Sequence, residues 1–398
     1  MKLASLIFTF LVIFGSCSSR SSENQTAGPA EKEQTLVLGA ERLDLYLPLM
    51  ENRAIALAVN HTSLLGDRHL VDTLLTLGVN IKKVFAPEHG FRGTQEAGEL
   101  VESGIDPKTS LPIVSLYGAN KKPTPEQLDD VDLIIFDIQD VGARFYTYIS
   151  TMHYLMEACA ENNKTLLILD RPNPNGDYVA GPILQEEHKS FIGMHPIPIV
   201  HGLTVAELAG MITGEQWLSG GLQCTLEIVP MENYHHQLRY TPPVKPSPNL
   251  PNYQSIRLYP SLCLFERTPI SLGRGTQFPF QVYGHPGFDQ NLFAFTPTSI
   301  PGMDNNPKHK DQACYGWDLR ETEAPELTLS YIISAYHLVE DKENFFMDGF
   351  NLRSGNTELM DQIKAGLTEE EIKKSWEAGL EGYRQLRKQY LLYPESAP

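Results

Sequence analysis

The sequence predicts an α/β fold whose first domain is a Rossmann-like, mainly parallel sheet. Between about residues 35 and 220, short runs of apolar residues alternate with segments of helical periodicity. Runs that are apolar throughout are typical of parallel strands covered on both faces by helices. After residue 220 the pattern changes to a proline-rich stretch and, later, two amphipathic helices. We therefore predict two domains, an α/β domain over 35–220 and a C-terminal α+β domain over 221–398.

Each predicted strand is a short apolar run, and the segments between the strands have helical spacing. One helix covers 70–77 and ends at Gly78, and a second covers 145–156. In the C-terminal part, a helix covers 329–339, and the last helix follows a capping box formed by Thr368 and Glu371. The predicted strands are Ala54–Val59, Val84–Ala86, Ile113–Leu116, Leu133–Phe136, Leu166–Leu169 and Ile197–Val200.

The N-terminus has the pattern of a bacterial lipoprotein signal. Lys2 precedes an apolar stretch, Leu6–Phe14, that is too short to span a bilayer as a helix. The box Gly15-Ser16-Cys17 predicts cleavage after residue 16 and lipidation of Cys17, followed by a flexible tether over 17–34. We expect an exported protein, lipid-anchored at the membrane and facing the periplasm or the cell surface. Phe14 stands where leucine is more usual, which leaves ordinary secretion as the alternative.

Charge and motif content exclude several classes of partner. The formal net charge of −17 argues against nucleic acid. No GxGxxG motif follows the first strand, so we predict no nucleotide and no cofactor. The histidines lack the spacing of metal ligands, and we predict no metal site. A disulfide suits an exported protein, but the sequence leaves the pairing open among Cys159, Cys224, Cys263 and Cys314.

Polar residues follow the predicted strands at their carboxyl ends. In open α/β sheets, ligands bind beyond this edge. The pattern therefore predicts a binding site along the rim, without deciding which residues contact the ligand. The rim comprises Asn60-His61, Glu88-His89, Tyr117-Gly118, Asp137–Asp140, Asp170–Asn173 and His201-Gly202.

Glu88 is the first candidate for a general acid or base. It lies in Pro87-Glu88-His89-Gly90, where a proline ends the strand and a glycine permits a sharp turn. Partial burial in such a turn raises a carboxyl pKa toward neutrality. The alternative is a solvated turn residue.

Each of the other candidates also has a structural alternative. Asp140 and Arg144 suit either a site or a simple i,i+4 surface pair. Glu266 and Arg274 suit either an interdomain site or a structural ion pair. The cluster Asp170–Asn173 suits sugar hydroxyls, with Asx-turn chemistry as its rival. Glu207 forms a capping box with Thr204, so we assign it to a helix end.

Six motifs, in order along the chain, together resemble the NamZ-type exo-β-N-acetylmuramidases. The resemblance covers about Leu36 to Tyr393 and implies an exported or lipid-anchored glycosidase that removes terminal N-acetylmuramic acid from peptidoglycan fragments. It also implies a site in a cleft between a Rossmann-like domain and a second subdomain. The motifs are Pro87–Gly93, Asp137–Arg144, Asp170–Pro174, His201–Thr204, Ser247–Pro251 and Gly273–Thr276.

Such chemistry needs an acid for the leaving oxygen and a second group, either a carboxylate or the acetamido group of the substrate. We predict Glu88, Asp140 and Glu266 as catalytic residues. The lactyl carboxylate of muramic acid favours a guanidinium, supplied by Arg92, Arg144, Arg171 or Arg274. Two rivals are a sugar-binding lipoprotein without turnover and a hydrolase of cell-wall peptide or ester bonds. The remaining predicted substrate contacts are Asn60, His89, Asp170, Asn173 and His201.

Overall fold

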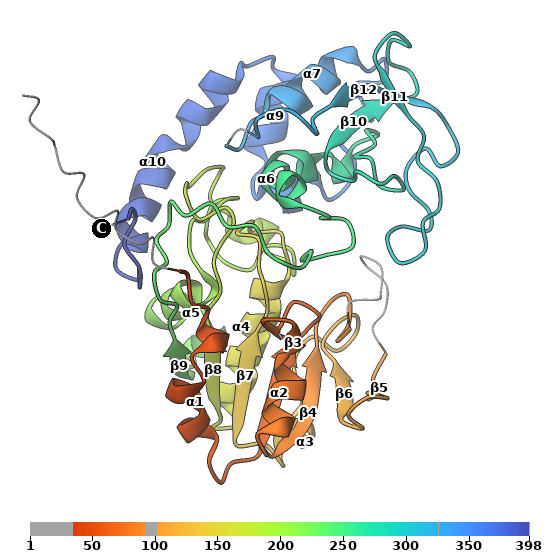
Figure 1. Cartoon of the computed structure of the whole chain (residues 1–398). Coiled ribbons are helices and arrows are strands. Elements are labelled where there is room, and N and C mark those ends of the chain that lie inside the picture. The colour runs from red at the N-terminus through yellow and green to blue at the C-terminus, as the bar shows by residue number, and fades with distance from the viewer. Residues whose placement is uncertain (1–34, 93–101, 325, 398) are drawn as a thin grey trace, which may run out of the picture. The chain divides into compact units, whose positions relative to one another are not determined.

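The computed structural model describes residues 35–92, 102–324 and 326–397. A seven-stranded sheet with the order β5-β6-β4-β1-β7-β8-β9 is parallel except for β5, which pairs antiparallel with β6 (Figure 1). This confirms the predicted α/β class. The strands are β1 (Ile55–Val59), β4 (Ile81–Ala86), β5 (Gly104–Ile105), β6 (Pro112–Ser115), β7 (Leu133–Asp137), β8 (Thr165–Leu169) and β9 (Thr225–Val229).

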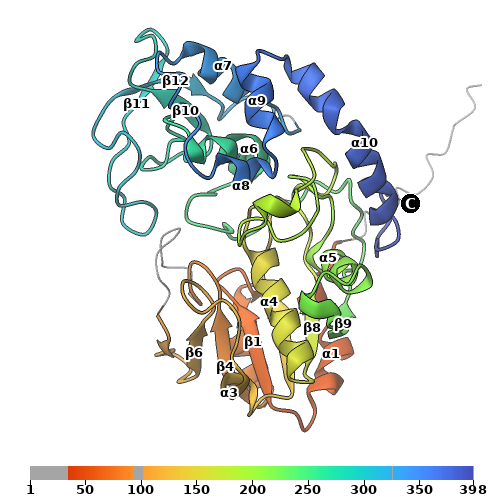
Figure 2. The ribbon, with the colours of Figure 1, turned by 180° about the vertical axis from the view of Figure 1, so that it is seen from behind.

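Both faces of the sheet are buried, as its apolar strands require. Alternate residues of each strand enter different cores: Ala56 and Ile134 pack on one side, and Leu57 and Ile135 on the other. Helices α1 (Leu43–Met50) and α2 (Leu70–Thr76) cover one face (Figure 1), and α4 (Tyr148–Glu161) and α5 (Val205–Gly214) cover the other (Figure 2). Helix α3 (Pro125–Leu128) precedes β7, and the short strands β2 (Leu64–Leu65) and β3 (Arg68–His69) form a hairpin before α2.

One predicted strand is wrong, and two strands of the large sheet, β5 and β9, were not predicted. Ile197–Val200 is not part of the sheet; Val200 forms only isolated bridges to Ala143 and Ala180. The sheet instead ends in β9, which follows residue 220, the predicted end of the first domain. β9 lies at the edge and its burial alternates, so it lacks the continuous apolar run that marked the other strands.

The second part of the chain carries a small antiparallel sheet and helices, in agreement with the predicted α+β character. The sheet has the order β10-β12-β11. Helix α10 extends back to the large sheet, where the Tyr383 hydroxyl donates to the carbonyl of His201 (2.8 Å) and the Arg387 guanidinium to that of Gly202. The elements are β10 (Val282–His285), β11 (Phe293–Phe295), β12 (Cys314–Asp318), α6 (Tyr253–Leu262), α7 (Ser330–Leu338), α8 (Phe350–Ser354), α9 (Glu358–Lys364) and α10 (Glu369–Arg387).

Two further sequence predictions concern the N-terminal signal segment and the pairing of the cysteines. Cys17 and the signal segment lie outside the described residues. No helix within the described ranges has both the length and the apolar character to cross a membrane. Cys159, Cys224, Cys263 and Cys314 are all free and buried, and the thiols of the first two contact each other.

Candidate active site

A cavity of about 420 Å³ lies beyond the carboxyl ends of β4 and β6, where the second part of the chain faces the sheet. Four of the predicted site residues line it: Glu88, His89, Glu266 and Arg274. Its size suits one sugar-sized ligand. The sheet side contributes Glu88, His89, Tyr117, Phe145, Tyr146, Thr147, Phe191 and Ile192, and the other side Ser247, Asn249, Leu250, Tyr259, Cys263, Glu266, Arg267, Arg274, Phe280, Asp304 and Arg353.

Glu88 enters the cavity from a tight turn after β4. The N–H of Gly90 donates to the carbonyl of Pro87 (2.9 Å), and His89 has a φ of 69°. A positive φ at a buried non-glycine residue is a strained conformation that is frequent at functional sites. The turn therefore combines a half-buried carboxyl group with a buried imidazole at the cavity wall.

Two hydroxyl groups orient the Glu88 carboxyl group. The Tyr117 hydroxyl donates to Oε1 (3.0 Å), and the Thr147 hydroxyl donates to Oε2 (2.7 Å). Burial and the neighbouring Glu88 charge raise the pKa of Tyr117 well above its usual value, so this phenol remains a donor at neutral pH. Both of these donors are neutral hydroxyl groups, and together they fix the direction of the carboxyl group.

Glu266 is held by two guanidinium groups. Arg274 donates to Oε1 (2.6 Å), and Arg353 donates through two nitrogens to Oε2 (2.6 and 3.2 Å). Burial opposes ionisation, but the two arginines outweigh it and lower the pKa of Glu266 to about 2. Glu266 therefore remains ionised near neutral pH and is unsuited to donate a proton.

Asp140 does not line the cavity. Its Oδ1 accepts the N–H of Gly142 (2.7 Å), and among the described residues no donor reaches Oδ2. Burial raises the pKa of Asp140 to about 7. Because Asp140 is not among the residues that line the cavity, we withdraw it as a catalytic candidate.

Arg144 and Arg171 also differ from the prediction. Arg144 is fully buried and donates to the carbonyls of Pro182, Ile197, Arg353 and Ser354. Arg171 forms a two-nitrogen ion pair with Asp137 (2.5 and 2.9 Å). Both guanidiniums have structural partners, and neither residue lines the cavity.

Four further residues that were predicted to contact the substrate are buried and bonded within the protein. They are Asn60, Asp170, Asn173 and His201. The side chains of Asn60 and Asn173 accept backbone N–H groups two residues ahead, as in Asx turns. Asp170 accepts the Tyr393 hydroxyl (2.7 Å) and the N–H of Ala206 (3.1 Å). Burial lowers the pKa of His201 to about 3, so this imidazole is neutral. The rival interpretation, Asx-turn chemistry, holds for Asn173, whereas the partners of Asp170 are distant in the sequence.

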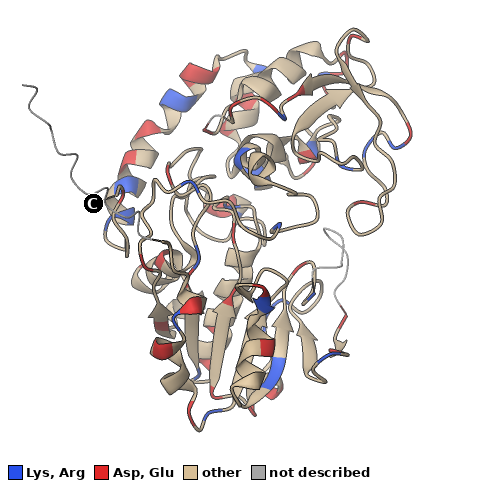
Figure 3. Ribbon diagram, viewed as in Figure 1, with Lys and Arg blue, Asp and Glu red and all other residues tan. Residues whose placement is uncertain are grey.

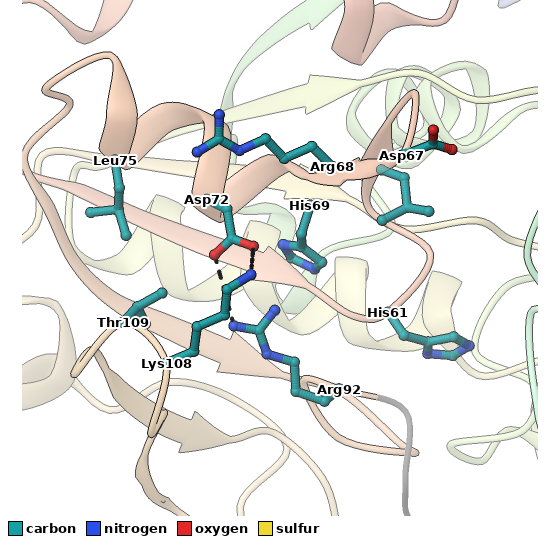
Figure 4. Close-up of a pocket in the computed structure, with 10 residues that line it drawn as sticks. His61, Asp67, Arg68, His69, Asp72, Leu75, Arg92, Lys108 and Thr109 are labelled. Carbon is teal, nitrogen blue, oxygen red and sulfur yellow. Dashed lines mark hydrogen bonds and ion pairs between the residues drawn. The ribbon is translucent and has the colours of Figure 1, made fainter.

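Arg92 lines a different depression, of about 660 Å³, between β3, α2 and the segment before β6 (Figure 4). Its guanidinium pairs with Asp106 (2.7 Å), and Lys108 pairs with Asp72 (2.5 Å). This depression is open to solvent, and two of its cations, Arg92 and Lys108, are paired with carboxylates. It is larger than the first cavity but lacks an opposing wall from the second part of the chain.

Sequence reasoning missed several residues of the cavity. Arg353 lies in α8 and carried no motif that pointed to it. Arg267 adjoins Glu266, a signal that we did not use. Among the described residues, no group of three or more histidine, cysteine, aspartate or glutamate side chains could hold a metal ion.

Comparison with known proteins places the chain in a family. The model of the N-terminal part of the exo-β-N-acetylmuramidase NamZ matches residues 55–254, and that of its C-terminal part matches residues 257–393. The peptidoglycan β-N-acetylmuramidase NamZ of Bacillus subtilis (strain 168) is 37% identical, over 97% of this chain and 99% of the relative.

Two crystal structures of DUF1343 family proteins from Bacteroides fragilis NCTC 9343 have the same fold. One is 45% identical with a TM-score of 0.86 and covers 91% of this chain and all of its own. The other is 29% identical with a TM-score of 0.79 and covers 90% of this chain and 99% of its own. The chain thus belongs to the NamZ exo-β-N-acetylmuramidase family.

Proposed function

We propose that this protein is an exo-acting glycosidase that releases terminal, non-reducing, β-linked N-acetylmuramic acid from peptidoglycan fragments during cell-wall turnover. The observation that carries the proposal is the cavity in which Glu88, oriented by two hydroxyls, faces a wall of arginines. Family membership supplies the reaction class, and the cavity supplies a carboxyl group for acid–base chemistry.

Glu88 acts as the general acid in this proposal. Its proton goes to the glycosidic oxygen as the bond from C1 to that oxygen breaks, and water adds to C1. The second group is either a carboxylate or the acetamido group of the substrate. Glu266, ionised but bonded by Arg274 and Arg353, contributes negative charge to the wall rather than a proton.

The cavity also accounts for exo action. Aromatic side chains, among them Tyr146, Tyr259 and Phe280, enclose a volume suited to one sugar. The second part of the chain forms the wall opposite the sheet, and the volume of about 420 Å³ suits a single terminal sugar better than the middle of a glycan strand. We infer removal of one sugar at a time from the non-reducing end.

Product analysis on a defined disaccharide, β-N-acetylmuramyl-N-acetylglucosamine, tests the proposal. We expect both monosaccharides as products, and longer strands should shorten by one sugar. Binding without products would support the sugar-binding alternative. Cleavage of only peptide or ester bonds in muropeptides would support the other hydrolase.

We further propose that the protein is exported and lipid-anchored through Cys17. This rests on the Gly15-Ser16-Cys17 box and the apolar stretch before it. Cys17→Ala should abolish incorporation of labelled fatty acid and leave the precursor uncleaved, with kcat unchanged because residue 17 is not among the proposed site residues. A wild-type protein that is wholly soluble and carries no acyl group would reject the anchor.

A further inference from the structure

The wall opposite Glu88 has the opposite charge to the whole protein. The chain carries a net charge of −17, and both signs are spread over the ribbon (Figure 3). Around Glu266, however, basic side chains outnumber acidic ones. An adjoining cavity of about 280 Å³ shares this wall, and its charged residues are Glu266, Arg267, Arg274, Asp304, Lys308 and Arg353.

Most of these cations already have partners. Arg274 and Arg353 are engaged by the two oxygens of Glu266. The ammonium group of Lys308 donates to the carbonyls of Phe265 (2.9 Å) and Thr268 (2.6 Å). Burial lowers the pKa of Lys308 to about 8, which leaves it mainly protonated at neutral pH.

Arg267 differs from its neighbours. Its side chain lines both cavities, it is exposed, and no carboxylate in the described ranges forms an ion pair with it. Its backbone is nevertheless fixed, because its carbonyl accepts the N–H of Met347 (2.9 Å) at the end of the 3₁₀-helix Cys263–Arg267. A fixed backbone with an uncommitted guanidinium is suited to bind an anionic group of a ligand.

We propose that Arg267 binds the carboxylate of the lactyl group on muramic acid and thereby determines specificity for this sugar. The inference rests on the proposed function, because it assumes that the sugar ring lies in the cavity with Glu88. N-acetylglucosamine lacks the lactyl group and would leave the guanidinium without its anion. Arg274 and Arg353 are weaker candidates for this role because the Glu266 carboxylate already balances part of their charge.

The test compares Arg267→Met and Arg267→Lys with the wild type and with Arg53→Met, an exposed arginine in the turn before β1. The substrates are 4-nitrophenyl β-N-acetylmuramide and 4-nitrophenyl β-N-acetylglucosaminide at equal concentrations. Loss of a charged hydrogen bond worth roughly 1.5–3 kcal/mol corresponds to about 10- to 150-fold. Arg267→Met should therefore lower kcat/KM on the muramide by that factor, mainly through KM, and leave the glucosaminide rate unchanged.

The conservative variant and the control sharpen the result. Arg267→Lys keeps the charge but loses bidentate geometry, so it should retain part of the preference. Arg53→Met should match the wild type on both substrates. An unchanged preference for the muramide in Arg267→Met would overturn the inference.

Calorimetric binding of the free sugars separates this inference from the proposed function. The wild type should bind N-acetylmuramic acid more tightly than N-acetylglucosamine, and Arg267→Met should bind the two equally. If these binding results are obtained but the wild type releases neither sugar from its glycosides, the proposed glycosidase activity is rejected and the assignment of Arg267 stands. Equal binding by the wild type would overturn the assignment.

Discussion

The two walls of the cavity hold their carboxyl groups in opposite ways. On the sheet side, the neutral hydroxyls of Tyr117 and Thr147 bond Glu88. On the other side, Arg274 and Arg353 bond Glu266 and lower its pKa to about 2. The difference agrees with the two roles that we propose: the first wall exchanges a proton with the substrate, and the second supplies a fixed arrangement of charges.

Removing the charge of Glu266 should have the largest effect on stability. Glu266→Gln leaves two half-buried guanidiniums without their anion, and we expect a loss of roughly 2–4 kcal/mol in the free energy of unfolding. Urea denaturation measures this loss. Arg320→Met, which removes an exposed ion pair with Asp318, is the matched control and should cost less than about 1 kcal/mol. Equal losses would contradict the structural role of the Glu266 cluster.

Replacing Asp140 should have an intermediate effect on the free energy of unfolding, and this effect should depend on pH. Its pKa is raised from 3.8 to about 7 by burial, so the unfolded carboxyl ionises first as the pH rises. The wild type should therefore lose stability between about pH 4 and pH 7 and keep that deficit above pH 7. Asp140→Asn can still accept the N–H of Gly142, and it should be about 1–3 kcal/mol more stable than the wild type at pH 8 but not at pH 4. Denaturation of both proteins at pH 4 and pH 8 measures this difference in stability. The same difference at both pH values would show that the ionisation of Asp140 does not cause it.

The hydroxyls beside Glu88 should give the smallest effect. Tyr117→Phe removes one orienting hydrogen bond and leaves the ring in the wall, and we expect turnover to fall roughly 3- to 10-fold without loss of stability. Thr147→Val tests the second hydroxyl in the same way. A larger effect on melting temperature than on kcat would indicate that these hydroxyls serve the fold.

Local sequence pattern predicted the sheet because its strands are apolar on both faces. The same criterion failed for Ile197–Val200, where a buried apolar run forms only isolated bridges, and for the edge strand β9, whose exposure alternates. Whether an apolar run enters a sheet depends on contacts remote in the sequence. No local signal carries that information.

Site residues that lie together in one turn could be predicted from the sequence. Those that distant segments bring together could not. Glu88 and His89 line the cavity as the strand-end pattern predicted. Arg144 shows the opposite outcome, because two carbonyls from the segment after β8 and two from α8 converge on its guanidinium. The same folding brings α8, and with it Arg353, to the wall of the cavity.

The role of Glu88 as general acid is the central claim, and a comparison of leaving groups tests it most directly. Turnover of Glu88→Gln is measured on β-N-acetylmuramyl-N-acetylglucosamine and on 4-nitrophenyl β-N-acetylmuramide. The sugar leaving group needs a proton and 4-nitrophenolate does not, so we predict a loss of about 10²- to 10⁴-fold on the disaccharide and a far smaller loss on the nitrophenyl glycoside. Equal losses on both substrates, or near wild-type turnover of the disaccharide, would contradict the assignment.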